Sequence, residues 1–282
     1  MSELLVCVDF SKSSINALNY AVLLANKINC DILMVWVNKP DKSDSLLPFD
    51  NQSLKLDIKS KFEELVEKYS PKLKTGKIKY KLRKGKVYQE IVNQAKYDDA
   101  YMIIAGTHGV SGFEEYWIGS NAYKIVTYSP CPVVTVRQSF NIKKTISKIV
   151  LPIDSTMETR QKVPFTAELA RPFDAEVHIL ALYSSSVKAI RNKVDSYAKQ
   201  VAKFLIESNI RCKIEAIEAT NVTNSTIEYA VGVNADLISI MTEQETSASN
   251  IWLGTYAQQM VNHSPIPVLN LHPKELLKIF SK

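Results

Sequence analysis

The chain has 282 residues, of which 46% are hydrophobic and 23% are charged, and its formal net charge is +6. This length fits about two ordinary domains, which could be a tandem repeat or two unlike domains. No apolar run approaches the roughly 20 residues that a membrane-spanning helix needs, so we expect a soluble, globular protein with no membrane partner.

The start of the chain and its cysteines indicate a cytoplasmic protein. Residues 1–9 lack the basic flank, the apolar stretch and the cleavage site of a secretion signal. The four cysteines have no CxxC spacing and stand in or beside apolar runs, which is typical of reduced core residues. The four histidines show no ligand spacing with the cysteines, so we expect no metal held by the protein.

Strand-like and helix-like patterns alternate along the first half. The apolar run at 4–8 predicts a buried strand, and the helix-spaced residues after it follow capping serines at Ser11 and Ser13. The expected order is strand 4–8, helix 15–25, strand 32–37, helix 54–69, strand 77–83, helix 87–95, strand 101–105, a helix from about 121, and strand 133–136.

The strand at 77–83 is basic on one side. Lys77, Lys79, Lys81 and Arg83 alternate with apolar residues, which is the period of a strand with one wet face. A lysine-rich strand commonly protects the edge of a sheet from pairing with another chain, and we favour this interpretation. Nucleic acid is the least favoured partner, because no recognisable nucleic-acid fold accompanies these cations.

Three short motifs recur in the second half. The apolar run 5–9 ends in Asp9, and the similar run 150–154 ends in Asp154, so the two motifs are offset by 145 residues. The motifs 117–120 and 129–133 recur at 252–255 and 264–268, an offset of 135 residues. We therefore predict two copies of one domain, residues 1–140 and 147–282, the second shortened where the first carries the polar stretch 39–53.

The second copy repeats the order of strands. Its strands are expected at 149–153, 177–182, 212–219, 237–241 and 268–271. Pro164 interrupts the first helical pattern of this copy, so we expect a kink or a later helix start there. Alternating elements with apolar strands predict an α/β fold, with two tandem doubly wound parallel-sheet domains.

Four of the eight glycines gather in one loop, and they mark a candidate site. Gly106, Gly109, Gly112 and Gly119 fall between a predicted strand and a predicted helix. A glycine-rich loop that leads into a helix offers main-chain N–H groups to phosphate, although such a turn can also serve packing alone. The spacing is neither that of a P-loop nor that of a dinucleotide-binding fingerprint.

These motifs resemble the universal stress protein family, in its ATP-binding branch and its tandem form. The resemblance rests on Gly106-Thr107-His108-Gly109, on Ile118-Gly119-Ser120 and on the closing Ser129-Pro130-Cys131-Pro132, and it covers essentially the whole chain. It implies five-stranded Rossmann-like sheets with strand order 3-2-1-4-5, whose last strands pair across a pseudo-twofold axis. Strands 1 and 4 would then meet where open α/β sheets bind ligands.

The resemblance also implies a binding site for an adenine nucleotide in the first domain. ATP, or ADP or AMP, would be bound there, and any Mg²⁺ would be held through the nucleotide phosphates. No catalytic residue is implied. The residues implied for the phosphate and adenosine ends are Asp9, Val37, Gly106, Thr107, His108, Gly109, Gly119, Ser120 and Asn121.

The second copy departs from this pattern. Met241 and Gln244 stand where the first copy has Gly106 and Gly109, and only Gly254-Thr255 survives. We expect this half to bind ATP weakly or not at all, and Asp154 to serve a structural turn.

Three functions remain open at this point. The favoured one is a nucleotide-responsive regulatory protein of the stress response, whose two domains pair within one chain. The alternatives are a slow ATPase or autophosphorylating enzyme, and a nucleotide-free interaction protein. A protein partner and a further homodimer stay open.

Overall fold

The computed structural model describes residues 2–39, 51–107, 119–242, 244–247 and 250–273. The N-terminal half alternates strands and helices as its sequence predicts, with shifts of at most three residues at their ends. Its elements are β1 (Glu3–Cys7), α1 (Lys12–Ile28), β2 (Asp31–Asn38), α2 (Asn51–Tyr69), β3 (Ile78–Lys84), α3 (Val87–Tyr97), β4 (Met102–Gly106), α4 (Ser120–Tyr128) and β5 (Val133–Val136).

The C-terminal half repeats this order, and its described residues include a hairpin that the sequence does not predict. Its strands and helices are β6 (Lys148–Ile153), α5 (Val163–Ala170), β7 (Glu176–Tyr183), α6 (Lys188–Glu207), β8 (Cys212–Glu218), α7 (Val222–Gly232), β9 (Leu237–Met241), β10 (Gln244–Ser247), β11 (Asn250–Leu253), α8 (Thr255–His263) and β12 (Val268–Leu271). Pro164 lies in the first turn of α5, where its missing N–H costs nothing, so the later helix start is confirmed.

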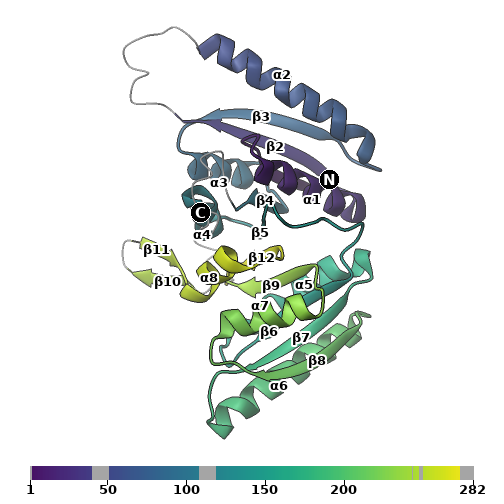
Figure 1. Cartoon of the computed structure of the whole chain (residues 1–282), viewed down its shortest axis with the longest axis vertical. Helices are drawn as coiled ribbons and strands as arrows, with labels where there is room; N and C mark the ends of the chain where they lie inside the picture. The colour runs from purple at the N-terminus through teal and green to yellow at the C-terminus, as the bar shows by residue number, and fades with distance from the viewer. Residues whose placement is uncertain (1, 40–50, 108–118, 243, 248–249, 274–282) are drawn as a thin grey trace.

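A single ten-stranded sheet runs through both halves. The strand order is β3-β2-β1-β4-β5-β12-β9-β6-β7-β8, and all neighbours are parallel except β5 and β12 (Figure 1). Each half therefore has the expected order 3-2-1-4-5, and the α/β fold class is confirmed. The antiparallel pair at the centre joins the last strands of the two domains, as a pseudo-twofold relation requires.

The sheet separates two hydrophobic cores. Alternate residues of each strand point to opposite faces, so Leu4 and Val6 pack under α1 and α2, whereas Leu5 packs toward α3 and α4. The first core continues under α5 and α6, and the second continues under α7 and α8. Both faces are covered, which explains why the central strands are almost wholly apolar.

Polar side chains form hydrogen bonds across the junction between the two halves. The amide of Asn270 donates to the carbonyl of Val133 at 3.1 Å, and the hydroxyl of Thr135 donates to the carbonyl of Val268 at 3.4 Å. Asn270 and Thr135 occupy matching positions of β12 and β5. The two last strands are therefore held by side chains as well as by the main-chain ladder.

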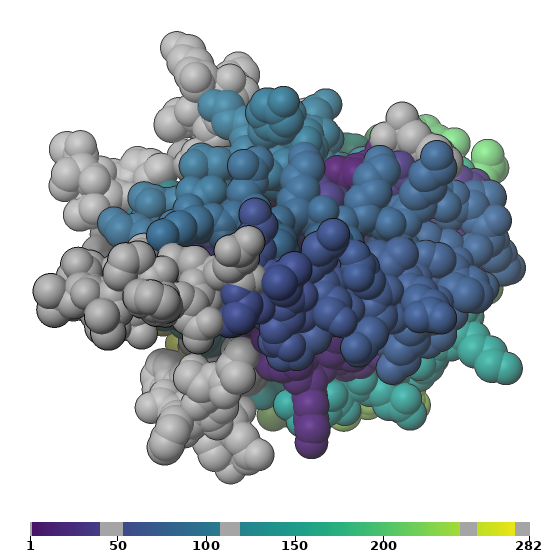
Figure 2. All heavy atoms as spheres, turned by 90° about the horizontal axis from the view of Figure 1, so that it is seen from above, coloured from purple at the N-terminus to yellow at the C-terminus, as the bar shows by residue number. Residues whose placement is uncertain are grey.

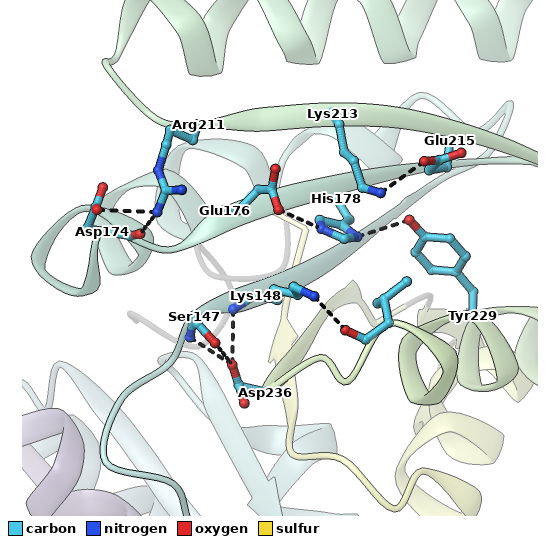
Figure 3. A network of polar contacts seen from close by, with 11 residues as sticks. Ser147, Lys148, Asp174, Glu176, His178, Arg211, Lys213, Glu215, Tyr229 and Asp236 are labelled. Atoms are coloured by element: carbon cyan, nitrogen blue, oxygen red, sulfur yellow. Dashed lines mark hydrogen bonds and ion pairs between the residues drawn. The ribbon is translucent and has the colours of Figure 1, made fainter.

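A carboxylate anchors the start of the second domain. Asp236 Oδ2 accepts hydrogen bonds from the main-chain N–H groups of Ser147 and Lys148 and from the Ser147 hydroxyl, at 2.7 to 3.0 Å (Figure 3). Its other oxygen pairs with Lys143 at 2.6 Å. These contacts lower the pKa of the largely buried Asp236 against the effect of its burial, so it stays ionised.

The basic strand β3 is an edge strand, as its lysines predict. Figure 2 looks onto this end of the molecule, where the blue α2 and β3 cover the N-terminal half. The cations of β3 are not simply solvated, because acidic or amide groups of neighbouring elements bind them. The contacts are Lys79 with Asp31 at 3.1 Å, Lys81 with Asp98 at 3.0 Å and Arg83 with Gln94 at 2.6 Å.

No helix within the described ranges combines the length and the apolar character needed to cross a bilayer.

Candidate functional site

A cavity of about 470 Å³ opens at the carboxyl ends of β1, β2 and β4. Its volume lies within the range of small-molecule sites. The starts of α3 and α4 close it on one face of the sheet. Strands β1 and β4 are neighbours although two strands separate them in the sequence, so the cavity lies at the switch point of the sheet, where open α/β sheets bind ligands.

Seven of the nine residues predicted for the site line this one cavity. His108 and Gly109, together with the rest of 108–118, lie outside the described residues. The seven are Asp9, Val37, Gly106, Thr107, Gly119, Ser120 and Asn121.

The first turn of α4 supplies the cavity with main-chain donors. Gly119 is the N-cap of α4 and has no side chain with which to cap the helix. Its own N–H donates to the carbonyl of Thr107 at 2.8 Å and so closes the base of the glycine loop. The N–H groups of Ser120 and Asn121 come next, where helical N–H groups have no partner within the helix. Together with the helix dipole, they favour an anion at this end of the cavity.

Gly106 serves packing as much as ligand approach. A Cβ at this position would lie 2.5 Å from Ser13 Oγ and 2.8 Å from the main-chain carbon of Ser13 in α1. The absence of a side chain therefore lets α1 lie directly against the end of β4. The sequence suggested close approach of backbone to a ligand, and the structure shows that the neighbouring helix uses the space.

Asp9 holds the turn between β1 and α1. Its Oδ1 accepts hydrogen bonds from the N–H of Ser11 at 3.0 Å and from the Ser11 hydroxyl at 2.6 Å. The next residue, Phe10, has a φ of 63°, which a bulky side chain rarely adopts. Packing of Phe10 on Phe62 at 4.9 Å between ring centroids supports this conformation. The carboxylate is thereby fixed at the rim of the cavity.

Apolar side chains form part of the lining of the cavity. Val35, Val37, Val87, Ile91 and Ile125 line it from β2, α3 and α4. The register of β1 on β2 ends with Cys7 opposite Val35, so the main chain of Val37 extends past the end of β1 and borders the cavity. This part of the lining offers apolar walls beside main-chain polar groups, as a flat heterocycle requires.

Several lining residues escaped prediction from the sequence. Cys7, Ser14, Val87 and Ile91 line the cavity, although none belongs to the glycine motif. Cys7 could have been found, because it is the last residue of β1. Burial raises the pKa of the Cys7 thiol, and the nearby Asp9 carboxylate adds to this, so the thiol stays neutral. Val87 and Ile91 depend on how α3 packs, which no local motif reveals.

The corresponding edge of the second domain carries a hairpin after its fourth strand. The segment that follows β9 forms the antiparallel β10–β11 hairpin, with Gln244 opposite Leu253. Met241 takes the position of Gly106, and only 6% of it is exposed. Asp154 nonetheless repeats the turn of Asp9, because its Oδ1 accepts from the N–H of Thr156 at 2.7 Å and from the Thr156 hydroxyl at 2.5 Å. The structural turn predicted for Asp154 is present.

A second polar cluster lies away from the cavity, on β7. The imidazole of His178 is held between Tyr229 and Glu176, each at 3.0 Å (Figure 3). Burial lowers the pKa of His178, and the Glu176 carboxylate opposes this only in part. Both ring nitrogens are satisfied in a nearly dry position, which identifies His178 as a core histidine.

Among the described residues, no group of three or more histidine, cysteine, aspartate or glutamate side chains is arranged to hold a metal ion.

Comparisons with known proteins agree with this architecture. The model of the universal stress protein family matches residues 1–137 and again 145–272. Universal stress protein YxiE of Bacillus subtilis is 26% identical over 146 residues, which are 48% of this chain and 99% of that protein. Universal stress protein MJ0531 of Methanocaldococcus jannaschii is 25% identical over 148 residues, which are 48% of this chain and 85% of that protein.

Solved structures extend the likeness of fold to the whole chain. A universal stress protein of Archaeoglobus fulgidus superimposes with a TM-score of 0.75 at 16% identity, covering 96% of this chain and 98% of that one. A functionally unknown protein of Pseudomonas aeruginosa PAO1 superimposes with a TM-score of 0.70 at 16% identity, covering 100% and 96% of the two chains. At this identity the likeness concerns the tandem fold alone.

Proposed function

This chain belongs to the universal stress protein family, and we propose that it is a regulatory protein of the stress response that binds an adenine nucleotide in its N-terminal domain. The proposal includes the cytoplasmic location expected from the sequence. The C-terminal domain, in which Met241 and the β10–β11 hairpin replace the glycine loop, serves as a docking partner without a nucleotide of its own.

One observation carries the proposal. A helix whose N-cap is a glycine directs its first turn into a cavity of about 470 Å³ at the switch point of the sheet. Free main-chain N–H groups and a positive dipole end stabilise negative charge, and phosphate is the common biological anion that they bind. The triphosphate of ATP would therefore lie at Ser120 and Asn121.

The rest of the nucleotide would lie against the apolar part of the lining. The apolar walls formed by Val37, Val87 and Ile91 suit the flat face of adenine, and the main chain of Val37 borders the same space. Asp9 at the rim is a hydrogen-bond acceptor suited to the ribose hydroxyls. Mg²⁺ would be bound through the phosphate oxygens, since the described residues offer no cluster of metal ligands here.

Substitution of Ser120 by aspartate tests the site of the phosphates. Ser120→Asp places a carboxylate at the first residue of α4, where it suits the helix dipole but repels phosphate. We expect ATP to bind the unmodified protein at one nucleotide per chain, and the variant to bind at least tenfold more weakly with an unchanged or higher melting temperature. Titration calorimetry and native mass spectrometry measure the affinity and the stoichiometry.

The chain supplies a matched control for this experiment. Thr255 is the first residue of α8 and follows Gly254 as Ser120 follows Gly119. Thr255→Asp changes the same helical position in the domain proposed to be empty, so ATP affinity should stay within a factor of two. The proposal fails if the unmodified protein shows no heat with ATP, ADP or AMP, or if both variants weaken binding equally.

A further inference from the structure

Helix α4 belongs to the N-terminal domain but contacts the C-terminal one. Its first turn lines the cavity with Ser120, Asn121 and Ala122. The same helix packs against β11, one strand of the hairpin of the other half (Figure 1). With nine residues, α4 spans only about 13 Å from the cavity to its last turn. It is therefore a physical link between the cavity and the hairpin.

A histidine of the second domain lies beside the last turn of α4. The carbonyl of Val126 would normally accept from the residue four positions later, which is Pro130 and has no N–H. The imidazole of His272, which directly follows β12, lies beside the main chain of Val126. This contact crosses the domain boundary at a buried position, since only 6% of His272 is exposed.

The same histidine reaches the base of the hairpin. Nδ1 of His272 lies 2.6 Å from the hydroxyl of Thr242, which is fully buried. The N–H of Thr242 donates to the carbonyl of Leu271 at 2.8 Å. Thr242 directly follows β9, and β10 begins two residues after it. A continuous route therefore leads from the cavity through α4 and His272 to the point where the hairpin begins.

We propose that occupancy of the N-terminal cavity is transmitted through α4, His272 and Thr242 to the β10–β11 hairpin, which is the part of the C-terminal domain that reports the bound nucleotide. The inference rests on the proposed function, because the ligand must act on the first turn of α4. Phosphate bound there fixes the helix start, and the packing of α4 on β11 and beside His272 transfers that restraint to the hairpin. Binding then favours the ordered arrangement of both elements.

Hydrogen exchange of the full-length protein with and without saturating ATP tests the coupling. Amide exchange reports local opening, so a restrained hairpin exchanges more slowly. We expect ATP to slow exchange at least threefold in residues 119–125 and also in residues 244–253. Thr242→Val removes the hydroxyl at nearly constant shape, so this variant should keep the response of 119–125 and lose that of 244–253. Thr242→Ser retains the hydroxyl and should keep both responses.

The outcomes separate the coupling from nucleotide binding itself. If ATP protects 119–125 and leaves 244–253 unchanged in the unmodified protein, the coupling is wrong and the proposed function stands. If the hairpin still responds in Thr242→Val, the route through His272 is wrong. If calorimetry detects no ATP binding and neither segment responds, the proposed function fails and the coupling fails with it. Circular dichroism and melting curves establish that each variant is folded.

Discussion

At the carboxyl ends of the strands, the two domains share the same turn and the same helix N-cap but differ in the residues around them. Asp9 and Asp154 make the same turn after the first strand of each half, and Gly119 and Gly254 stand at the same N-cap. One edge nevertheless encloses a cavity, whereas at the other a methionine is buried and a hairpin follows the strand. The repeated features thus belong to the fold, and the features that differ indicate where function has diverged.

A single position explains much of the difference. In the first domain Gly106 lets α1 begin at Lys12, close behind β1. In the second domain Met241 occupies that position, and the corresponding residues form only the 3₁₀ turn Glu158–Arg160 before α5 begins at Val163. A side chain at the end of the fourth strand would collide with a first helix placed as α1 is, and Pro164 in the first turn of α5 also favours the later start.

The repeated Ser-Pro motif belongs to the shared frame. The hydroxyl of Ser129 donates to the carbonyl of Cys131 at 2.6 Å and accepts from its N–H at 3.2 Å. Ser264 makes the same pair of bonds with Ile266, at 2.7 and 3.1 Å. The motif therefore shapes the entry to the last strand in both halves, independently of any ligand.

The largest expected effect comes from making the first domain more like the second at Gly106. In Gly106→Ala the new Cβ would lie 2.8 Å from the main chain of Ser13, so α1 must move. We expect the free energy of unfolding in urea to fall by about 3 kcal/mol, as for overpacked cores, and ATP affinity to fall at least tenfold.

Gly232 supplies the control for this substitution. It lies in α7 and has no positive φ, and apart from its chain neighbours and its own helical backbone no atom lies within 4 Å of the place that a Cβ would take. Gly232→Ala should be neutral or stabilise the protein by up to about 1 kcal/mol, because alanine has the better helix propensity. Equal losses of stability in the two variants would show that the packing on Ser13 is not the cause.

The residues that follow the last strand of each half differ in charge. Arg137 stays charged at all relevant pH values, whereas His272 is a neutral imidazole whose pKa burial lowers to about 4. The unfolded chain binds a proton near pH 6.5 and the folded one does not, so the contribution of His272 to stability is lost as the pH falls from 6.5 toward 4. Only the C-terminal side of the pseudo-twofold junction should therefore be sensitive to mild acid.

His272→Gln tests this sign. Between pH 7 and pH 5 the unmodified protein should lose about 2 kcal/mol more of its free energy of unfolding than the variant does. Urea titrations at a series of pH values measure the difference. Parallel pH profiles for the two proteins would mean that His272 does not titrate on unfolding. The other buried histidine, His178, is present in both proteins and cancels in the comparison.

Much of the fold could be predicted from the sequence, because each strand is a short apolar run. The strands at 133–136, 237–241 and 268–271 have the predicted limits, and the basic alternation of β3 correctly indicates an edge. The β10–β11 hairpin could not be predicted, since its segment has neither a run of β-branched residues nor an Asn-Gly or Asp-Gly turn signal. Its packing on α4 depends on the other domain, which no local pattern encodes.

The candidate site was predictable only in part, for a similar reason. The motif residues Gly119 and Ser120 and the strand end Asp9 are visible as local patterns, and all three line the cavity. The apolar wall contributed by Val87 and Ile91 comes from the packing of α3 on the sheet, and a helix-spaced pattern predicts burial without saying against what. The packing role of Gly106 likewise needs the position of Ser13, which is distant in the sequence.

The smallest expected effect separates the structural role of Asp9 from its proposed role toward the ligand. Asp9→Ala and Asp154→Ala remove equivalent pairs of hydrogen bonds, to Ser11 and to Thr156. Each should lower the free energy of unfolding by about 1 kcal/mol, as loss of a helix or turn cap does. Calorimetry should show ATP binding weakened several-fold in Asp9→Ala alone, because only Asp9 borders the cavity. Equal affinity of the two variants for ATP would mean that Asp9, like Asp154, only stabilises its turn. Other groups at the rim would then have to hold the ribose.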